Sequence, residues 1–404
     1  MKQRRAPALA VLSALLTACA SAPPARPAAP PSEPPVHTCP CRLAKLRAAT
    51  GPHWVGTWTS APQPIESASG LAHATLRQVL RVSLGGERLR VRFSNQFGNG
   101  PLTITAAHLA MAQAGIDAAT DRELRFSGQP GVTIAAGETV WSDPLDFHLP
   151  PLGRLAVSVA TGEVPETLTG HATSASELQP GNAVSAADLK AAVRLDSGYL
   201  LSGVDVWAAP TSQAIVVLGD SLSHGWPAAL AERLQAQPAF ANIAVLDQSL
   251  DGNALVLHGK GPTAARRFAR DVLEQSGARW LIILAGLNDI AAAQGDASAS
   301  IIAAYQDLIA RAHARDMLVY GVPILPFGGS TYDTPVHQTA RQRVNAWLRE
   351  HATVDAVIDL PAAVHAPADP TRLAPDLDSG DHVHPNPAGQ RKMAEAVPLS
   401  LFQR

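Results

Sequence analysis

The chain has 404 residues, of which 46% are hydrophobic and 16% are charged. This balance indicates a folded protein and excludes a largely disordered one, and the length favours two domains over a single small core. The formal net charge is −2, which does not suggest a nucleic acid or an anionic membrane surface as a partner held by charge.

The first residues have the features of an export signal. A basic segment (residues 1–5) precedes an apolar stretch (residues 6–16) that is too short to span a bilayer. Small residues then precede Cys19, which is similar to a bacterial lipoprotein signal, in which this cysteine is lipidated and becomes the first residue. We expect residues 1–18 to be removed and the protein to be anchored in the bacterial outer membrane, facing the periplasm or the outside. An ordinary cleaved signal and a secreted protein are the alternative.

Residues 19–50 are predicted to form a tether. Seven of the sixteen residues from Ser21 to Val36 are prolines, which favours a semi-rigid polyproline segment. Cys39 and Cys41 are the other two cysteines of the chain. A disulfide between them would be strained, and too few ligands lie nearby for a metal site. Neither cysteine is assigned a catalytic role.

Residues 51–208 have the pattern of a β-rich module. Two alternating segments, Leu80–Leu84 and Arg88–Phe93, flank Gly85-Gly86 and are predicted to form a hairpin. Further strands are expected at Leu102–Thr105, Gly131–Ile134, Val140–Trp141 and Leu155–Ala160. Short strands at this spacing predict a β-sandwich or jelly-roll-like module. Its role is either to bind glycan or to pack against the second half of the chain.

Residues 209–404 are predicted to form an α/β domain. The five apolar segments expected as strands are Ala214–Leu218, Ile243–Leu246, Trp280–Ala285, Met317–Val322 and Ala356–Ile358. The helical stretches among them are Trp226–Ala236, Thr263–Ser276, Ala299–Ala314 and Val336–His351. This alternation predicts a doubly wound, largely parallel sheet with helices on both faces. No phosphate-binding glycine motif is present.

Four short polar segments carry the candidate chemistry. Gly219-Asp220-Ser221 follows the first strand, at the sheet edge where such folds bind ligands, although a turn with Ser221 as a helix N-cap is an alternative. The other segments are Gln248–Asn253 after the second strand, Gly286–Asp289 after the third, and Asp381–Pro385. The last one precedes a helix that Asn386 could cap, with Pro387 at its first position.

In order and spacing these segments resemble the four conserved blocks of the SGNH hydrolase superfamily, the GDSL-type esterases and lipases. The resemblance covers about residues 213–400. It implies a flavodoxin-like fold with a five-stranded parallel sheet. The N-terminal half, with its segments Trp54–Trp58 and Arg90–Asn95, resembles the extra module of the acetyl-xylan-esterase-like branch.

Ester hydrolysis needs a nucleophile, a base, an orienting acid and donors for the oxyanion. Ser221 is the expected nucleophile, His384 the general base and then acid, and Asp381 the group that orients the imidazole. The expected oxyanion hole consists of the backbone N–H groups of Ser221 and Gly252 and the side-chain amide of Asn288. Supporting roles are expected for Asp220 and Asp289.

Several of these residues have other interpretations. Gly252 could simply permit a turn, Asn288 and Asp289 could cap the following helix, and His382 could replace His384 as the base if the segment were a strand. The acidic and histidine residues between Asp376 and His384 could also suggest a metal site. A calcium loop requires glycine at its sixth position, however, and Gly380 is fifth. No metal and no other cofactor are expected.

Two aromatic residues are candidates for the substrate pocket. Trp226 lies at the start of the first predicted helix of the α/β domain, and Tyr332 lies in the loop from Pro326 to Pro335. A packing role is an equally good interpretation of each. The expected activity is removal of short acyl groups, acetyl above all, from a carbohydrate or similar alcohol. The alternatives are a lipase or phospholipase acting on longer chains and, last, a non-catalytic glycan-binding lipoprotein.

Overall fold

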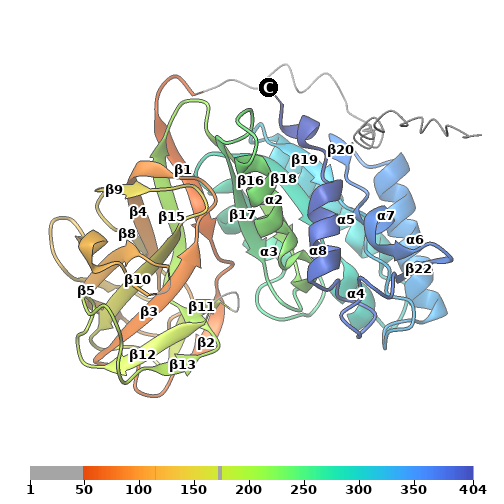
Figure 1. Cartoon of the computed structure of the whole chain (residues 1–404). Helices are drawn as coiled ribbons and strands as arrows, with labels where there is room; N and C mark the ends of the chain where they lie inside the picture. The colour runs from red at the N-terminus through yellow and green to blue at the C-terminus, as the bar shows by residue number, and fades with distance from the viewer. Residues whose placement is uncertain (1–48, 114, 172–174, 404) are drawn as a thin grey trace, which may run out of the picture. The chain divides into compact units, whose positions relative to one another are not determined.

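The computed structural model describes residues 49–113, 115–171 and 175–403 (Figure 1). The predicted signal, Cys19, Cys39, Cys41 and nearly all of the predicted tether lie outside the described residues. Within the described ranges, no helix has both the length and the apolar character needed to cross a membrane.

The antiparallel strands of the first half form three sheets (Figure 1). Their bounds are β1 His53–Thr59, β2 Gln63–Glu66, β3 Ala74–Arg81, β4 Gly86–Ser94, β5 Leu102–Met111, β6 Arg122–Leu124, β7 Val132–Ile134, β8 Thr139–Trp141, β9 Leu145–Leu149, β10 Arg154–Thr161, β11 Thr167–His171, β12 Ser176–Pro180, β13 Val193–Leu195, β14 Gly198–Tyr199 and β15 Leu201–Ala208. One sheet has the order β1-β15-β4-β8, with β9 also paired to β4. The second has the order β13-β12-β3-β10-β5-β6, with β7 paired to β5, and the third is β14-β11-β2. The predicted β module is therefore present.

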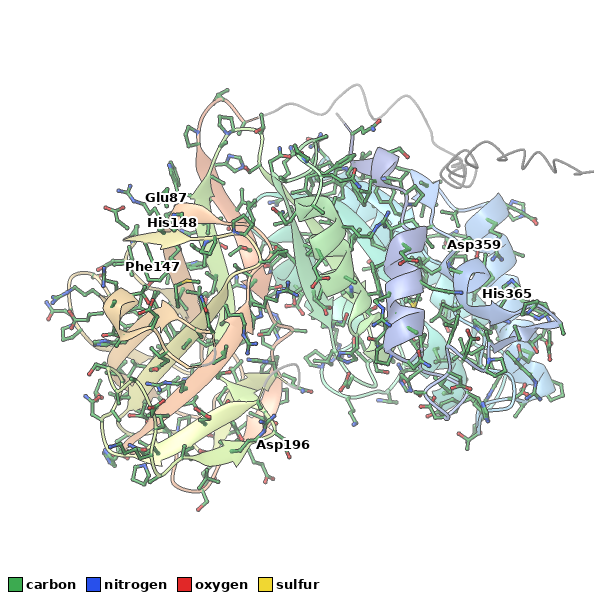
Figure 2. All side chains as sticks on the ribbon, viewed as in Figure 1. Glu87, Phe147, His148, Asp196, Asp359 and His365 are labelled. Atoms are coloured by element: carbon green, nitrogen blue, oxygen red, sulfur yellow. The ribbon has the colours of Figure 1, made fainter. Side chains whose placement is uncertain are left out.

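The predicted hairpin around Gly85-Gly86 is wrong. Strand β3 pairs with β10 and β12, whereas β4 pairs with β15, β8 and β9, so the chain passes from one sheet to another between them. A Cβ atom on Gly85 would lie 2.5 Å from the carbonyl oxygen of Leu149, which only glycine avoids. These glycines thus permit a close crossing between sheets. Exposed Glu87 and His148 form a cross-strand pair at 2.7 Å on β4 and β9 (Figure 2).

The second half contains the predicted parallel sheet. Its strands are β16 Gln213–Gly219, β17 Ile243–Ser249, β18 Ala278–Leu284, β19 Leu318–Gly321 and β20 Ala356–Val357. All neighbouring pairs are parallel, and the order is β17-β16-β18-β19-β20. The order reverses at β16, so the end of this strand is the topological switch point at which α/β sheets place their ligand sites.

The helices of this half agree with the sequence pattern. They are α2 Trp226–Gln235, α3 Ala264–Phe268, α4 Leu287–Ala292, α5 Ser298–His313, α6 Pro335–Glu350, α7 Leu360–Val364 and α8 Pro387–Ala396. A π-helical turn, η3 (Ala269–Leu273), continues α3, and a short hairpin joins β21 (His365–Ala366) to β22 (Asp369–Leu373). Asn386 caps α8 as expected, because its Oδ1 accepts hydrogen bonds from the N–H groups of Ala388 and Gly389.

The antiparallel strands contact the parallel sheet through β1 and β17. The N–H group of Gly56 donates to the carbonyl oxygen of Ser276 at 2.8 Å, and that of Val245 donates to Ser83 Oγ at 3.1 Å. A Cβ atom on Gly56 would lie 2.9 Å from a methyl group of Leu246. The buried apolar side chains of both halves belong to one connected cluster, so the β module contributes to the packing of the α/β half.

Candidate active site

Ser221 lies on a tight turn directly after β16. The turn is a 3₁₀ helix, η2 (Ser221–Ser223), and its N-cap is Asp220, whose Oδ1 accepts a hydrogen bond from the N–H group of Leu222 at 3.0 Å. Asp220 is therefore the N-cap of this turn, and the alternative interpretation of Ser221 as an N-cap is wrong. A Cβ atom on Gly219 would lie 2.1 Å from Ser223 Oγ and 2.9 Å from the backbone oxygen of Leu284, so a side chain here would clash with its surroundings.

The structure brings Ser221, His384 and Asp381 together in one chain of hydrogen bonds. Ser221 Oγ lies 2.8 Å from His384 Nε2, although the two residues are 163 positions apart. His384 Nδ1 lies 2.5 Å from Asp381 Oδ2. A hydroxyl, an imidazole and a carboxylate in this order can pass the serine proton to the imidazole and stabilise the imidazolium that results.

The turn around Asp381 keeps this carboxylate ionised. Its Oδ1 accepts hydrogen bonds from the N–H groups of Val383 at 3.0 Å and His384 at 2.9 Å, and from Ser379 Oγ at 3.0 Å. Partial burial acts to raise the pKa of Asp381, but these bonds and the one to the imidazole outweigh it and hold the pKa well below its usual value.

His382 has a different partner. Its Nδ1 lies 2.6 Å from Asp378 Oδ2, and its backbone has a φ of +63°. The segment is thus a turn and not a strand, so the histidines at 382 and 384 do not share a side, and only His384 contacts Ser221. In the part of the chain that the structure describes, no three His, Cys, Asp or Glu residues are grouped as metal ligands.

The segments that carry the other two expected oxyanion donors are hydrogen bonded to Gly219 and Asp220, directly before Ser221. Leu250 N–H donates to the carbonyl oxygen of Gly219 at 3.2 Å, which brings the loop with Gly252 to the end of β16. Gly252 has a φ of +63°, as its turn interpretation requires. Among the described residues, no hydrogen-bond partner is found for the backbone N–H of Ser221 or of Gly252. These two groups are therefore available to an oxyanion.

Asn288 connects the two loops that carry the other donors. Its Nδ2 donates to Asp220 Oδ2 at 2.8 Å and to the carbonyl oxygen of Asn253 at 3.1 Å. Asp220 is completely buried, and this burial raises its pKa to about 6 although the Leu222 N–H and the Asn288 amide oppose the shift. The amide of Asn288 is thus held by a carboxylate directly beneath Ser221.

Asp289 does not cap the helix that follows. The N-cap of α4 is Gly286, with a φ of +114° and no side-chain cap. The carboxylate of Asp289 instead accepts three backbone N–H groups of the loop after Gly252: Leu255 at 2.6 Å, Val256 at 2.9 Å and Leu257 at 2.9 Å. Asp289 is fully buried, so its role is to fix this loop.

Sequence reasoning missed Arg267, which is 2% exposed. Its guanidinium donates to the carbonyl oxygens of Gly219 at 3.0 Å and Gln248 at 2.6 Å, and to Asn253 Oδ1 at 3.0 Å. It also forms an ion pair with Asp271 at 3.2 Å. Arg267 therefore ties the ends of β16 and β17 to the loop of Gly252. The only local signal is the Arg–Asp spacing of four residues on a helix.

A second histidine was also missed. His224 Nε2 is hydrogen bonded to Asp251 Oδ1. This bond raises the pKa of His224, against the effect of burial. The cavity beside Ser221 is lined by Ser221, Leu222, His224, Ser379, His384, Pro385, Asn386, Pro387 and Gln390.

Neither aromatic candidate lines this cavity. Trp226 is fully buried, because the first residue of α2 faces the core, and this agrees with the packing interpretation of this residue. Tyr332 is 38% exposed in the loop before α6, and its carbonyl oxygen lies 2.8 Å from His337 Nδ1. Gly328 N–H, in the same loop, donates to the carbonyl oxygen of Thr371 at 2.7 Å.

Residues 217–392 match the family model of the GDSL-like Lipase/Acylhydrolase family. No curated protein matches the chain. Among solved structures, a GDSL-like lipase from Bacteroides thetaiotaomicron is 17% identical with a TM-score of 0.37, covering 47% of this chain and 88% of its own. A variant of an acetyl xylan esterase from Geobacillus stearothermophilus is 19% identical with a TM-score of 0.35, covering 46% and 92%. TesA is 22% identical with a TM-score of 0.37, covering 46% and 96%.

Proposed function

We propose that the protein is a carboxylic ester hydrolase that removes short acyl groups, acetyl above all, from a carbohydrate or similar alcohol. The match of residues 217–392 to the GDSL-like Lipase/Acylhydrolase family supports an ester as the substrate. The observation that carries the proposal is the hydrogen-bonded series Ser221 Oγ, His384 Nε2 and Nδ1, and Asp381 Oδ2, at 2.8 Å and 2.5 Å.

In the first half of the reaction Ser221 Oγ attacks the ester carbonyl carbon while His384 Nε2 accepts the serine proton. The tetrahedral intermediate then collapses, the bond to the alcohol oxygen breaks, and His384 returns the proton to the leaving alcohol. A water molecule repeats the same steps on the acyl-serine and releases the carboxylic acid. Asp381 keeps the proton on Nδ1 of the imidazole throughout, so that Nε2 can accept one from Ser221.

The negative charge of each intermediate needs donors that are already in place. The free N–H groups of Ser221 and Gly252 supply two. Both Nδ2 hydrogens of Asn288 are already bonded, to Asp220 Oδ2 at 2.8 Å and to the Asn253 carbonyl oxygen at 3.1 Å. Asn288 therefore becomes a third donor only when the oxyanion replaces the Asn253 carbonyl oxygen. Losing one such donor typically slows the reaction by about a hundredfold or more.

The lining of the cavity supports a short acyl group, because the described residues that form it include no row of long aliphatic side chains. Apart from Leu222 and two prolines, the residues around Ser221 carry hydroxyl, imidazole or amide groups. A long acyl chain needs a continuous apolar surface, since each buried CH₂ contributes about 0.8 kcal/mol. Leu222 is only 3% exposed, so it offers little apolar surface to such a chain.

The test combines one variant with a series of substrates. We expect Ser221→Ala to lower the rate of p-nitrophenyl acetate hydrolysis by about 10⁴-fold or more without changing the thermal unfolding temperature. A fluorophosphonate should label the wild type and not the variant. Wild-type activity should fall as the p-nitrophenyl ester grows from acetate to octanoate and should include acetylated xylan. A rise with chain length would instead indicate a lipase, and activity retained by the variant would reject the triad.

We also propose that the enzyme is exported and lipid-anchored through Cys19, as the N-terminal sequence predicts. In that case Cys19→Ser should move the protein from the membrane fraction to the soluble fraction and abolish labelling by a palmitate analogue. Labelling retained by the variant would exclude this anchor.

A further inference from the structure

His224 lies immediately after the turn that carries Ser221. Its N–H group donates to the carbonyl oxygen of Ser221 at 3.3 Å, and its side chain lines the same cavity as Ser221 and His384. Its Nε2 is bonded to Asp251, the residue before Gly252. A second histidine–carboxylate pair therefore lies beside the one that serves the nucleophile.

The pair leaves one ring nitrogen for a ligand. Asp251 engages Nε2, and within the described residues Nδ1 of His224 has no hydrogen-bond partner. The side chain is 36% exposed. The charged groups that face it are the carboxylates of Asp251, Asp247 and Asp220, which favour the imidazolium. In the imidazolium both ring nitrogens are donors, so Nδ1 can donate to a ligand while Nε2 donates to Asp251.

We propose that His224 determines specificity for the alcohol part of the substrate, with Nδ1 hydrogen bonded to a hydroxyl or ring oxygen of an acylated sugar. This inference rests on the proposed function. His384 returns a proton to the leaving alcohol, so the alcohol oxygen lies next to His384, in the cavity that His224 also lines. An acetyl methyl group gains nothing from an imidazole, whereas a sugar offers several oxygen acceptors. Asp251 holds the ring in position for this contact.

Two variants separate the nitrogens of the ring. His224→Gln keeps an amide near the position of Nε2, within reach of Asp251, and removes Nδ1. His224→Asn keeps an amide near Nδ1 and gives up the bond to Asp251. His382→Gln is the matched control, because His382 is also paired with an aspartate and lies two residues from His384, yet does not line the cavity.

The readout is kcat/KM on two acetate esters, with KM and kcat resolved: an acetylated xylo-oligosaccharide and p-nitrophenyl acetate, which has no sugar. We expect His224→Gln to lower kcat/KM on the sugar ester by about 10- to 100-fold, mainly through KM, because a hydrogen bond from a charged donor is lost. On p-nitrophenyl acetate the change should stay below about threefold. His224→Asn should fall between wild type and His224→Gln on the sugar ester, and His382→Gln should match the wild type on both.

Other outcomes overturn the inference. Equal losses on both esters would mean that His224 acts on the nucleophile turn, and no loss would mean that it has no role. If His224→Gln kept full activity on the sugar ester and His224→Asn lost it, the role of His224 would be only its hydrogen bond to Asp251. These outcomes overturn the inference about His224 but leave the proposed substrate standing. A wild type that hydrolyses p-nitrophenyl acetate but no acetylated sugar would overturn the proposed substrate as well, so the two failures can be distinguished.

Discussion

Two polar clusters meet at Ser221, and they differ in exposure. The relay of Ser221, His384 and Asp381 lies at the surface, with the His384 side chain 40% exposed and that of Asp381 51% exposed. The buried cluster beneath it consists of Asp220, Asn253, Arg267, Asn288 and Asp289. Asn288 is half-buried, and each of the other four is 2% exposed or less.

The difference separates two tasks. The relay must exchange protons with a substrate and with water, which requires access. The buried cluster bonds the ends of β16 and β17 and the loop after Gly252 to one another, and low polarity makes each of those bonds costly to break. Changes in the relay should therefore affect rate with little effect on stability, and changes in the buried cluster should affect stability first.

The largest effect should come from the acid of the relay. In Asp381→Asn the side-chain oxygen can still accept the N–H groups of Val383 and His384, but the amide nitrogen now faces Nδ1. The imidazole must then carry its proton on Nε2, where it cannot accept one from Ser221. We expect kcat to fall by about 10⁴-fold with an unchanged unfolding temperature. The measurement is steady-state hydrolysis of p-nitrophenyl acetate.

Asp378→Asn is the control, since that residue is paired with His382 and not with His384. It should keep near-wild-type kcat. If Asp381→Asn retained more than a tenth of the activity, Asp381 would not orient the base.

The buried cluster can be tested at Arg267. Arg267→Met leaves two strand-end carbonyl oxygens and Asn253 Oδ1 without their donor, while Asp271 keeps Arg270 as a partner at 2.5 Å. We expect the free energy of unfolding to fall by about 3–5 kcal/mol, because three buried acceptors lose a charged donor. Urea unfolding followed by circular dichroism measures it.

Arg266→Met is the matched control, because Arg266 is the exposed neighbour on the same helix. It should change the free energy of unfolding by less than about 0.5 kcal/mol. If both variants changed the free energy of unfolding equally, the buried guanidinium of Arg267 would stabilise the fold no more than the exposed one of Arg266.

The same division explains what sequence could predict. The relay and the parallel strands were accessible because each depends on local signals: an apolar segment, a turn residue, and a polar block at the end of a strand. The strand positions, the α8 cap at Asn386 and the contact of Ser221 with His384 follow from these signals.

What could not be predicted depends on partners that are distant in the sequence. The Asp289 carboxylate binds N–H groups 32 to 34 residues away, and no pattern in its own segment indicates them. Arg267 belongs to a residue type that is normally exposed. The two strands around Gly85 look like a hairpin locally, but which sheet each joins is decided by packing against β10 and β15.

Asp220 is the member of the buried cluster next to Ser221 in the chain, and it provides the smallest of the three tests. It caps the turn of Ser221 and holds Asn288, and its pKa is raised to about 6 by burial. Between the unfolded value of about 4 and this value, the folded state binds more protons than the unfolded state, so the Asp220 charge lowers stability as pH rises. Relative to Asp220→Asn, the wild type should lose about 2–3 kcal/mol of unfolding free energy between pH 4 and pH 7. Urea unfolding at each pH measures the difference, with Asp316→Asn, at an exposed carboxylate, expected to follow the wild type. Parallel curves for wild type and Asp220→Asn would mean that Asp220 is solvated in the folded enzyme and belongs with the exposed relay rather than with the buried cluster.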